Sequence, residues 1–274
     1  MKHTAEKLFG LLLLGLPLLG QSAQTLIIPQ VVDGGGWQST IVLTNPSASG
    51  VSATLTFHSD TTGGNTTAWT PAFLEVGSTN GLVLAPGSTL YLHTPGTAAA
   101  LTQGWGQLNS DAGVVAYAIF TNRVSGHQDQ DATAPAVAAT NRILVPYDDA
   151  SGFVSAIAVV NPTAAAQTIA VGFRTVEGNV AIDALPIVPP FGHMTFVLSQ
   201  QFPVIAGHRG LGEFYSSTGS LSMIALRFNP TQSFTSAPVY FQSGAQVIQP
   251  DPGIPYDPGN PYMYRSLRPP AATH

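Results

Sequence analysis

The sequence contains one extended motif twice, and this repeat constrains the fold more than any other feature. Residues 28–46 read IPQVVDGGGWQSTIVLTNP, and residues 145–162 read VPYDDASGFVSAIAVVNP. Both copies have an apolar residue and proline, then an aspartate, a glycine, an aromatic residue, an apolar run and Asn-Pro. The aromatic residues, Trp37 and Phe153, are 116 positions apart. A repeat of this length indicates two copies of one folded unit.

The motif has the period of a β-strand. Alternate residues from Trp37 to Asn45 fall on one face of an extended chain, and those from Phe153 to Asn161 fall on the matching face. Such alternation is typical of a half-buried strand, so we expect the aromatic and branched residues of this face to point into a core. Each strand then ends at Asn-Pro, because proline has no N–H to continue a ladder and asparagine favours turns.

Further segments match along the chain. Residues 53–57 match 169–173, residues 84–92 match 188–198, and residues 104–122 match 210–229. The offset falls from 116 to 106 by the last pair, and we place the extra length of the first copy around Thr94–Gln103. No segment has a sustained helical period, and Thr97–Thr102 is the best helical stub.

The fold class is predicted as all-β, with two tandem immunoglobulin-like antiparallel β-sandwich domains of about seven short strands each. The 28 glycines and 22 prolines are typical of short strands joined by turns. A single larger sandwich or barrel built from two half-units is the alternative. The predicted units are a first sandwich over 24–125, a linker over 126–141 and a second sandwich over 142–245. A Pro-rich tail over 246–274 is expected to be disordered.

The N-terminus has the pattern of a secretory signal peptide. Lys2 and Lys7 precede the apolar stretch Leu8–Gly20, and small residues follow up to Ala23. The stretch is shorter than the roughly 20 residues that a membrane-spanning helix needs. We therefore predict a signal peptide over 1–23, no transmembrane segment, and an exported protein that is extracellular or periplasmic.

Composition excludes several chemistries. The chain has no cysteine, and its only lysines lie inside the predicted signal peptide. Disulfides, thiolate catalysis and Schiff-base lysines are therefore ruled out for the mature protein. Nucleic acid is not an expected partner, because the arginines are scattered and the formal net charge is −5.

Three residues are the predicted ligand-binding residues. Asp33 lies in a DGGGW loop, where glycines permit close approach of a ligand and the carboxylate could bind a cation; the alternative is a strand-entry turn. Trp69 and Trp105 could stack on a sugar or anchor a partner if exposed; the alternative is core packing. The histidines and acidic pairs lack the spacing of zinc or calcium ligands, and no nucleophile elbow is present. We predict no metal, no cofactor and no catalytic residue.

The two motif copies resemble the DGGGW…NP opening of uncharacterised exported bacterial proteins with tandem immunoglobulin-like units. This resemblance implies architecture and an extracellular or periplasmic setting, and it carries no catalytic residues. A weaker resemblance is to periplasmic pilus chaperones, which grip a client carboxylate with a basic Arg and Lys. The first strand here, Thr25–Ile28, has no arginine.

The predicted function is that of a noncatalytic, exported structural, adhesion or partner-binding protein that contacts protein or glycan outside the cell. One alternative is a carbohydrate-binding module, and another is a pilus-type assembly chaperone. Strand edges unprotected by lysine could also pair between copies of the chain, so self-association is a further hypothesis.

Overall fold

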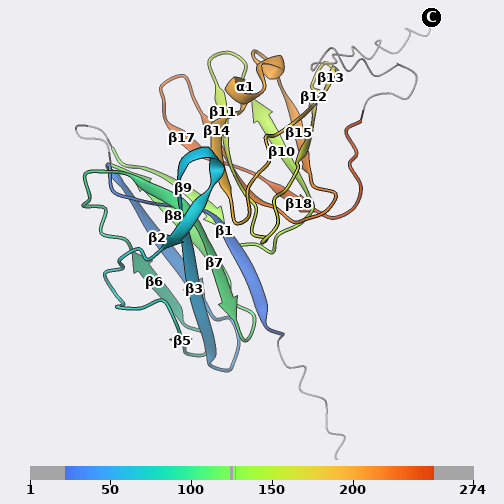
Figure 1. Ribbon diagram of the computed structural model, residues 1–274. Helices are drawn as coiled ribbons and strands as arrows, with labels where there is room; N and C mark the ends of the chain where they lie inside the picture. The colour runs from blue at the N-terminus through green and yellow to red at the C-terminus, as the bar shows by residue number, and fades with distance from the viewer. Residues whose placement is uncertain (1–21, 124–125, 127, 250–274) are drawn as a thin grey trace, which may run out of the picture.

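The computed structural model describes residues 22–123, 126 and 128–249, and this part of the chain is an all-β protein with several antiparallel sheets (Figure 1). The predicted signal peptide lies outside the described residues except for Ser22 and Ala23, and the predicted tail lies outside them from Pro250 onward. Within the described ranges, no helix has the length and apolar character needed to cross a membrane.

The first half of the chain forms two sheets. One sheet has the strand order β1-β7-β3-β4, with β5 paired to β3, and the other has the order β6-β2-β8-β9. The strands are β1 (Gln24–Asp33), β2 (Trp37–Thr44), β3 (Val51–Asp60), β4 (Thr66–Trp69), β5 (Leu82–Leu84), β6 (Thr89–His93), β7 (Thr102–Ser110), β8 (Val115–Asn122) and β9 (Gln130–Pro135), with a short 3-10 helix η1 (Thr62–Gly64).

The second half also forms two sheets. Their strand orders are β13-β12-β15-β10-β18 and β14-β11-β16-β17. The elements are β10 (Arg142–Asp148), β11 (Val154–Val160), β12 (Ala170–Thr175), β13 (Val180–Ala184), β14 (His193–Val197), α1 (Leu198–Gln201), η2 (Pro203–Ile205), β15 (Arg209–Tyr215), β16 (Ser222–Phe228), β17 (Phe234–Ala237) and β18 (Tyr240–Gln242).

In each half the two sheets face each other across a hydrophobic core. Ile41 and Leu43 of β2 are fully buried in the first core, and Val159 of β11 is fully buried in the second. These residues confirm the inward face expected from the alternation, but the strands are not half-buried as predicted, because Val42 and Val160 on the opposite face are buried too. The aromatic residues that begin the motif are only half-buried at the rim: Trp37 packs on Phe234, and the Arg227 guanidinium lies over the Phe153 ring.

Strand order and side-chain bonding correspond between the halves. β1-β7-β3-β4 corresponds to β10-β15-β12-β13, and β6-β2-β8-β9 corresponds to β14-β11-β16-β17. The side-chain NH₂ of Asn45 donates to three backbone carbonyls at 2.7–3.1 Å, and that of Asn161 does the same at 2.8–3.2 Å. At the end of each motif strand, the buried side-chain amide of the asparagine therefore stabilises the following turn through these hydrogen bonds.

The halves share an apolar seam. Ala158 of β11 and Ile224 of β16 belong to the hydrophobic cluster of the first half, although both lie on strands of the second. A smaller cluster joins Ile27, Trp105 and Val160 across the same seam. Figure 1 shows β9 near β17, and the Ser236 hydroxyl there donates to the Thr133 carbonyl at 2.8 Å. The halves are therefore packed together and not only connected by a loop.

Three details differ from the sequence-based expectations. Residues 126–141, predicted as a linker, include β9, which pairs with β8 and extends the first-half sheet. The extra length of the first half does not lie around Thr94–Gln103: the connection from β4 to β6 spans 70–88 and includes β5, whereas only 185–192 connect β13 to β14. The segment Thr97–Thr102 is not helical, and the α-helix follows β14 instead.

Candidate functional site

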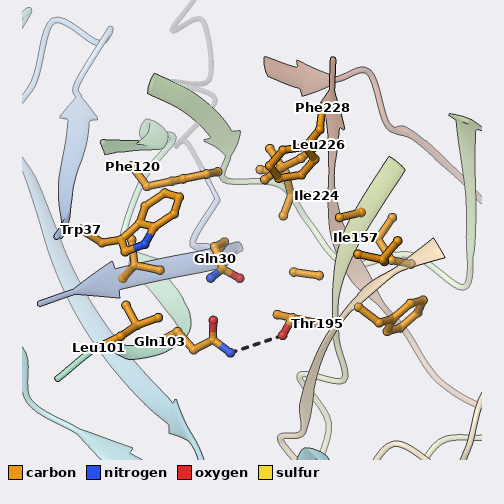
Figure 2. Close-up of a pocket in the computed structure, with 15 residues that line it drawn as sticks. Gln30, Trp37, Leu101, Gln103, Phe120, Ile157, Thr195, Ile224, Leu226 and Phe228 are labelled. Atoms are coloured by element: carbon orange, nitrogen blue, oxygen red, sulfur yellow. Dashed lines mark hydrogen bonds between the residues drawn. The ribbon is translucent and has the colours of Figure 1, made fainter. Parts of the chain in front are cut away.

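An apolar cleft of about 320 Å³ lies at the seam, with walls from both halves of the chain. Its volume is at the lower end of the range for small-molecule sites, roughly 300–1,000 Å³. Figure 2 shows Gln30 in the cleft, with Trp37 on the first-half wall and Ile224 on the second-half wall. The lining residues are Gln30, Val32, Trp37, Leu101, Gln103, Phe120, Ala156, Ile157, Ala158, Thr195, Phe196, Val197, Ile224, Leu226 and Phe228.

Aromatic rings form one end of the cleft. The Trp37 ring centroid lies 6.3 Å from that of Phe120, and the Phe228 centroid lies 5.5 Å from that of Phe234. Phe234, which is not itself in the lining, lies 5.8 Å from Trp37, so it joins the Trp37–Phe120 pair to Phe228. Leu101 is 47% exposed beside them and offers an apolar rim. The site can therefore bind an apolar group by removing ring and branched surfaces from water.

The loop before Trp37 fixes the position of its ring. Gly34, Gly35 and Gly36 all have positive φ, and a Cβ on Gly34 would lie too close to the Ala100 carbonyl. Glycine is therefore required for the chain to turn here. Backbone hydrogen bonds between Gly34 and Trp37 close the turn in both directions at 3.0 Å.

Two glutamines, Gln30 and Gln103, line the cleft with their side-chain amides. Gln30 is 8% exposed, and its Oε1 atom has no hydrogen-bond partner among the described residues. A buried polar atom without a partner destabilises a fold unless something else satisfies it. Gln103 has partners: its Nε2 donates to Asp60 at 2.9 Å and to Thr195 at 3.3 Å. The lining side chains carry no formal charge. The cleft lining therefore includes one unsatisfied acceptor, which is itself buried, and no acid or base.

A polar and aromatic network closes the seam beside the cleft. Nδ1 of the buried His193 lies 2.7 Å from Asp60. The His58 ring is stacked between Trp105, at 4.5 Å, and Phe191, at 5.6 Å. Burial between these rings lowers the pKa of His58 below its usual value, because the charged form loses hydration there. This network therefore belongs to the packing of the two halves.

Trp105 is not available to a ligand, contrary to the prediction. Its side chain is fully buried, and its Nε1–H donates to the Phe191 carbonyl at 2.9 Å. The first-half sequence shows only a tryptophan between two glycines. The cover comes partly from Phe191 of the second half, so the burial depends on tertiary contacts that no local pattern encodes.

The other two predicted residues also make internal contacts and lie outside the cleft lining. Trp69 is half-buried and packs edge-on against Phe57, with ring centroids 6.2 Å apart. The Asp33 carboxylate accepts a hydrogen bond from the Gly96 amide at 2.8 Å, which holds the loop after β6. Among the described residues, no three His, Asp or Glu side chains gather as a metal-binding group would. The structure does not bring Asp33, Trp69 and Trp105 together.

The sequence analysis missed Gln30, although the sequence contains a signal for it. Gln30 interrupts the apolar run Ile27–Val32, and a polar residue inside a strand that is buried on both sides needs an explanation. Leu101 and the second-half wall had no such signal, since their juxtaposition depends on how the halves pack. The comparisons with protein-family models, curated proteins and solved structures give no match to this chain.

Proposed function

We propose that this chain is a noncatalytic, exported binding protein of two tandem immunoglobulin-like β-sandwich units, and that its seam cleft holds a neutral, largely apolar group of a partner. The observation that carries the proposal is the unpaired Oε1 of Gln30 in an otherwise apolar, uncharged cleft. The group that it fits has an apolar body and one N–H or O–H donor.

The correspondence between the halves supports the proposal of two tandem immunoglobulin-like units. Both have paired sheets with the same strand connectivity, as immunoglobulin-like sandwiches have in general. Equivalent hydrogen bonds support it further, since Ser39 bonds the Val32 carbonyl and Ser155 bonds the Asp148 carbonyl. Export rests on the sequence pattern of Lys2, Lys7 and the apolar stretch that follows.

The chemistry of the lining supports binding and not catalysis. General acid–base catalysis needs a titratable group within hydrogen-bond reach of the reacting atom, and the cleft lining offers none. The cleft lining has no charged side chain, so it gives no support to the chaperone alternative, in which basic side chains bind the carboxylate of a client. The carbohydrate alternative loses Trp105 as a stacking platform, because the ring is fully buried.

The test uses the full chain and the uncharged fluorescent probe N-phenyl-1-naphthylamine, which has two aromatic units and one N–H donor. Its fluorescence rises when it enters an apolar site. We expect saturable binding to the unaltered chain, at least tenfold weaker in Ala156→Leu, which fills the cleft. The matched control is Ala68→Leu, on the exposed face of β4, which should bind as the unaltered chain does.

A second variant tests the hydrogen bond. Gln30→Met keeps a side chain of similar length but removes the amide acceptor. It should weaken binding of the N–H probe several-fold and leave binding of the N-methylated probe unchanged, because that analogue has no donor. Failure of the unaltered chain to bind, or equal affinity in Ala156→Leu, would overturn the proposal.

A further inference from the structure

We propose that the outer face of the sheet formed by β10, β12 and β15 carries a second site, which binds a carboxylate group between Arg174 and Arg209. Both arginines line a concavity of about 400 Å³ that is separate from the seam cleft. This site goes beyond the proposed function, and it uses different residues and a different ligand chemistry.

Strand register places the two arginines on one face. Arg174 is paired with Leu211 of β15, and Arg209 lies two residues along the same strand. Diagonal neighbours of this kind have Cα atoms roughly 7–8 Å apart. Phe173 and Phe214 belong to the core of the second half, so alternation directs Arg174, Arg209 and Leu211 outward. Two guanidinium groups therefore reach the same small area.

The charges there are unbalanced. Asp148 lies 3.3 Å from Arg209 and 2.8 Å from Arg227, so one carboxylate serves two arginines. The side chain of Arg174 has no hydrogen-bond or ion-pair partner among the described residues. The charged side chains that line the concavity are two arginines, Arg174 and Arg209, and one carboxylate, Asp148, so the lining has an excess of positive charge. Planar guanidinium groups bind carboxylates through paired N–H donors.

The neighbouring part of the same face shows how such a carboxylate can be held. Glu213 is fully buried, and its carboxylate accepts hydrogen bonds from the side chain of Arg142 at 2.7 Å and from the amide of Val247 at 2.9 Å. The Ile248 amide donates to it as well, and the Ile248 side chain packs where Gly172 leaves room. Val247 and Ile248 therefore cover the face at Glu213 and Gly172, whereas the neighbouring concavity at Arg174 is not covered by them.

Apolar surface beside the arginines defines the rest of the ligand. Val176 is 67% exposed, and Leu211 also lines the concavity. The ligand is therefore a carboxylate attached to a ring or a short apolar body. The carboxylate has two sources: a separate molecule such as an acidic sugar, or Asp251 and Asp257 of this chain, which follow Ile248 in the sequence.

The experiment measures the arginine Nε–H signals of the full chain by NMR at low ionic strength, since salt screens exposed charges. The probe is trigalacturonate, and maltotriose is the neutral control. The variants are Arg174→Gln, Arg209→Gln and Asp251→Asn with Asp257→Asn. Arg123→Gln is the matched control, because Arg123 is exposed and its nearest carboxylate, Asp129, is 3.9 Å away.

If the source is a separate molecule, trigalacturonate shifts the Arg174 and Arg209 signals, and its affinity falls at least tenfold in Arg174→Gln and not in Arg123→Gln. If the source is the chain itself, the double asparagine variant shifts the Arg174 signal and then admits trigalacturonate. Both results support the carboxylate site. An Arg174 signal that neither the probe nor the double variant moves, or an equal shift with maltotriose, would overturn it.

Discussion

Nδ1 of His193 lies 2.7 Å from a carboxylate oxygen of Asp60, and this contact joins the second half of the chain to the first. His193 begins β14 with its side chain fully buried, and Asp60 ends β3. The other oxygen of Asp60 accepts a hydrogen bond from Gln103 at 2.9 Å. The seam is therefore held by a buried polar network as well as by apolar packing, and its geometry fixes one wall of the cleft.

Asp60→Ala tests this network. The change removes the partner of His193 Nδ1 and one partner of Gln103 Nε2, and an unsatisfied buried polar group costs about 1–3 kcal/mol. We expect the free energy of unfolding to fall by about 2 kcal/mol, measured by chemical denaturation with tryptophan fluorescence. Asp129→Ala, at an exposed position where the nearest cation, Arg123, is 3.9 Å away, is the control and should change it by less than about 0.5 kcal/mol. Equal effects of the two substitutions would contradict the structural role.

Asn45→Ala and Asn161→Ala test the correspondence between the halves. Each asparagine is fully buried and donates to three backbone carbonyls. Each substitution removes the side-chain donor from those carbonyls, although the Val188 carbonyl keeps the hydrogen bond from the Gln167 amide, so we expect losses of about 2 kcal/mol in each case. The two losses should agree within about 1 kcal/mol by the same denaturation measurement. A large loss at one position and none at the other would show that the turns differ in what holds them.

The motif faces could be predicted because they are local. Strand alternation places Ile41 and Val159 in their cores, and the Asn-Pro ends follow from the missing proline N–H. β9 was not predicted although it also alternates: Ala132 and Ala134 are buried between exposed neighbours. Alanine is too small to give a clear hydrophobic period, so the segment has the composition of a loop.

The cleft could not be predicted, because it depends on contacts between distant parts of the chain. Trp37 and Ile224 line it from different halves, and the packing of Ala158 and Ile224 against the first-half core helps to bring them together. The same packing buries Trp105 under Phe191 and removes it from the surface. A repeat in the sequence defines each unit but contains no information on which faces of the two units meet.

His58 makes stability depend on pH near neutrality. Burial lowers the pKa of His58 in the folded state below the value of 6.5 that applies when the chain is unfolded. As pH falls below about 6.5, the unfolded chain binds a proton that the folded chain binds less readily, so the free energy of unfolding decreases. His58→Phe keeps a ring between Trp105 and Phe191 and cannot titrate. It should flatten this part of the stability curve, measured from about pH 7.5 to 5.5. An unchanged slope in the variant would assign the effect to another group.

The adjacent Asp148 and Asp149 should respond to pH in opposite directions. Burial raises the pKa of Asp149 and outweighs its hydrogen bonds from Ser199 and the Ser155 amide. Burial also acts on Asp148, but hydrogen bonds from Arg227 and Ala150 and the charge of Arg209 bring the pKa of that carboxyl below its usual value. Asp149 therefore contributes stability at acidic pH that is lost as pH rises above about 3.8, whereas the contribution of Asp148 is present above that pH and is lost on acidification.

Substitution by asparagine separates the two carboxyls. At neutral pH we expect Asp149→Asn to be more stable than the unaltered chain, because it removes a charge that is costly to bury. Asp148→Asn should be less stable at the same pH, because Arg227 and Arg209 lose their shared anion. Near pH 3 both differences should shrink, since both carboxyls are then largely protonated in the unfolded chain. Chemical denaturation at the two pH values measures this, and a loss of stability at neutral pH in Asp149→Asn as large as in Asp148→Asn would refute the assignment.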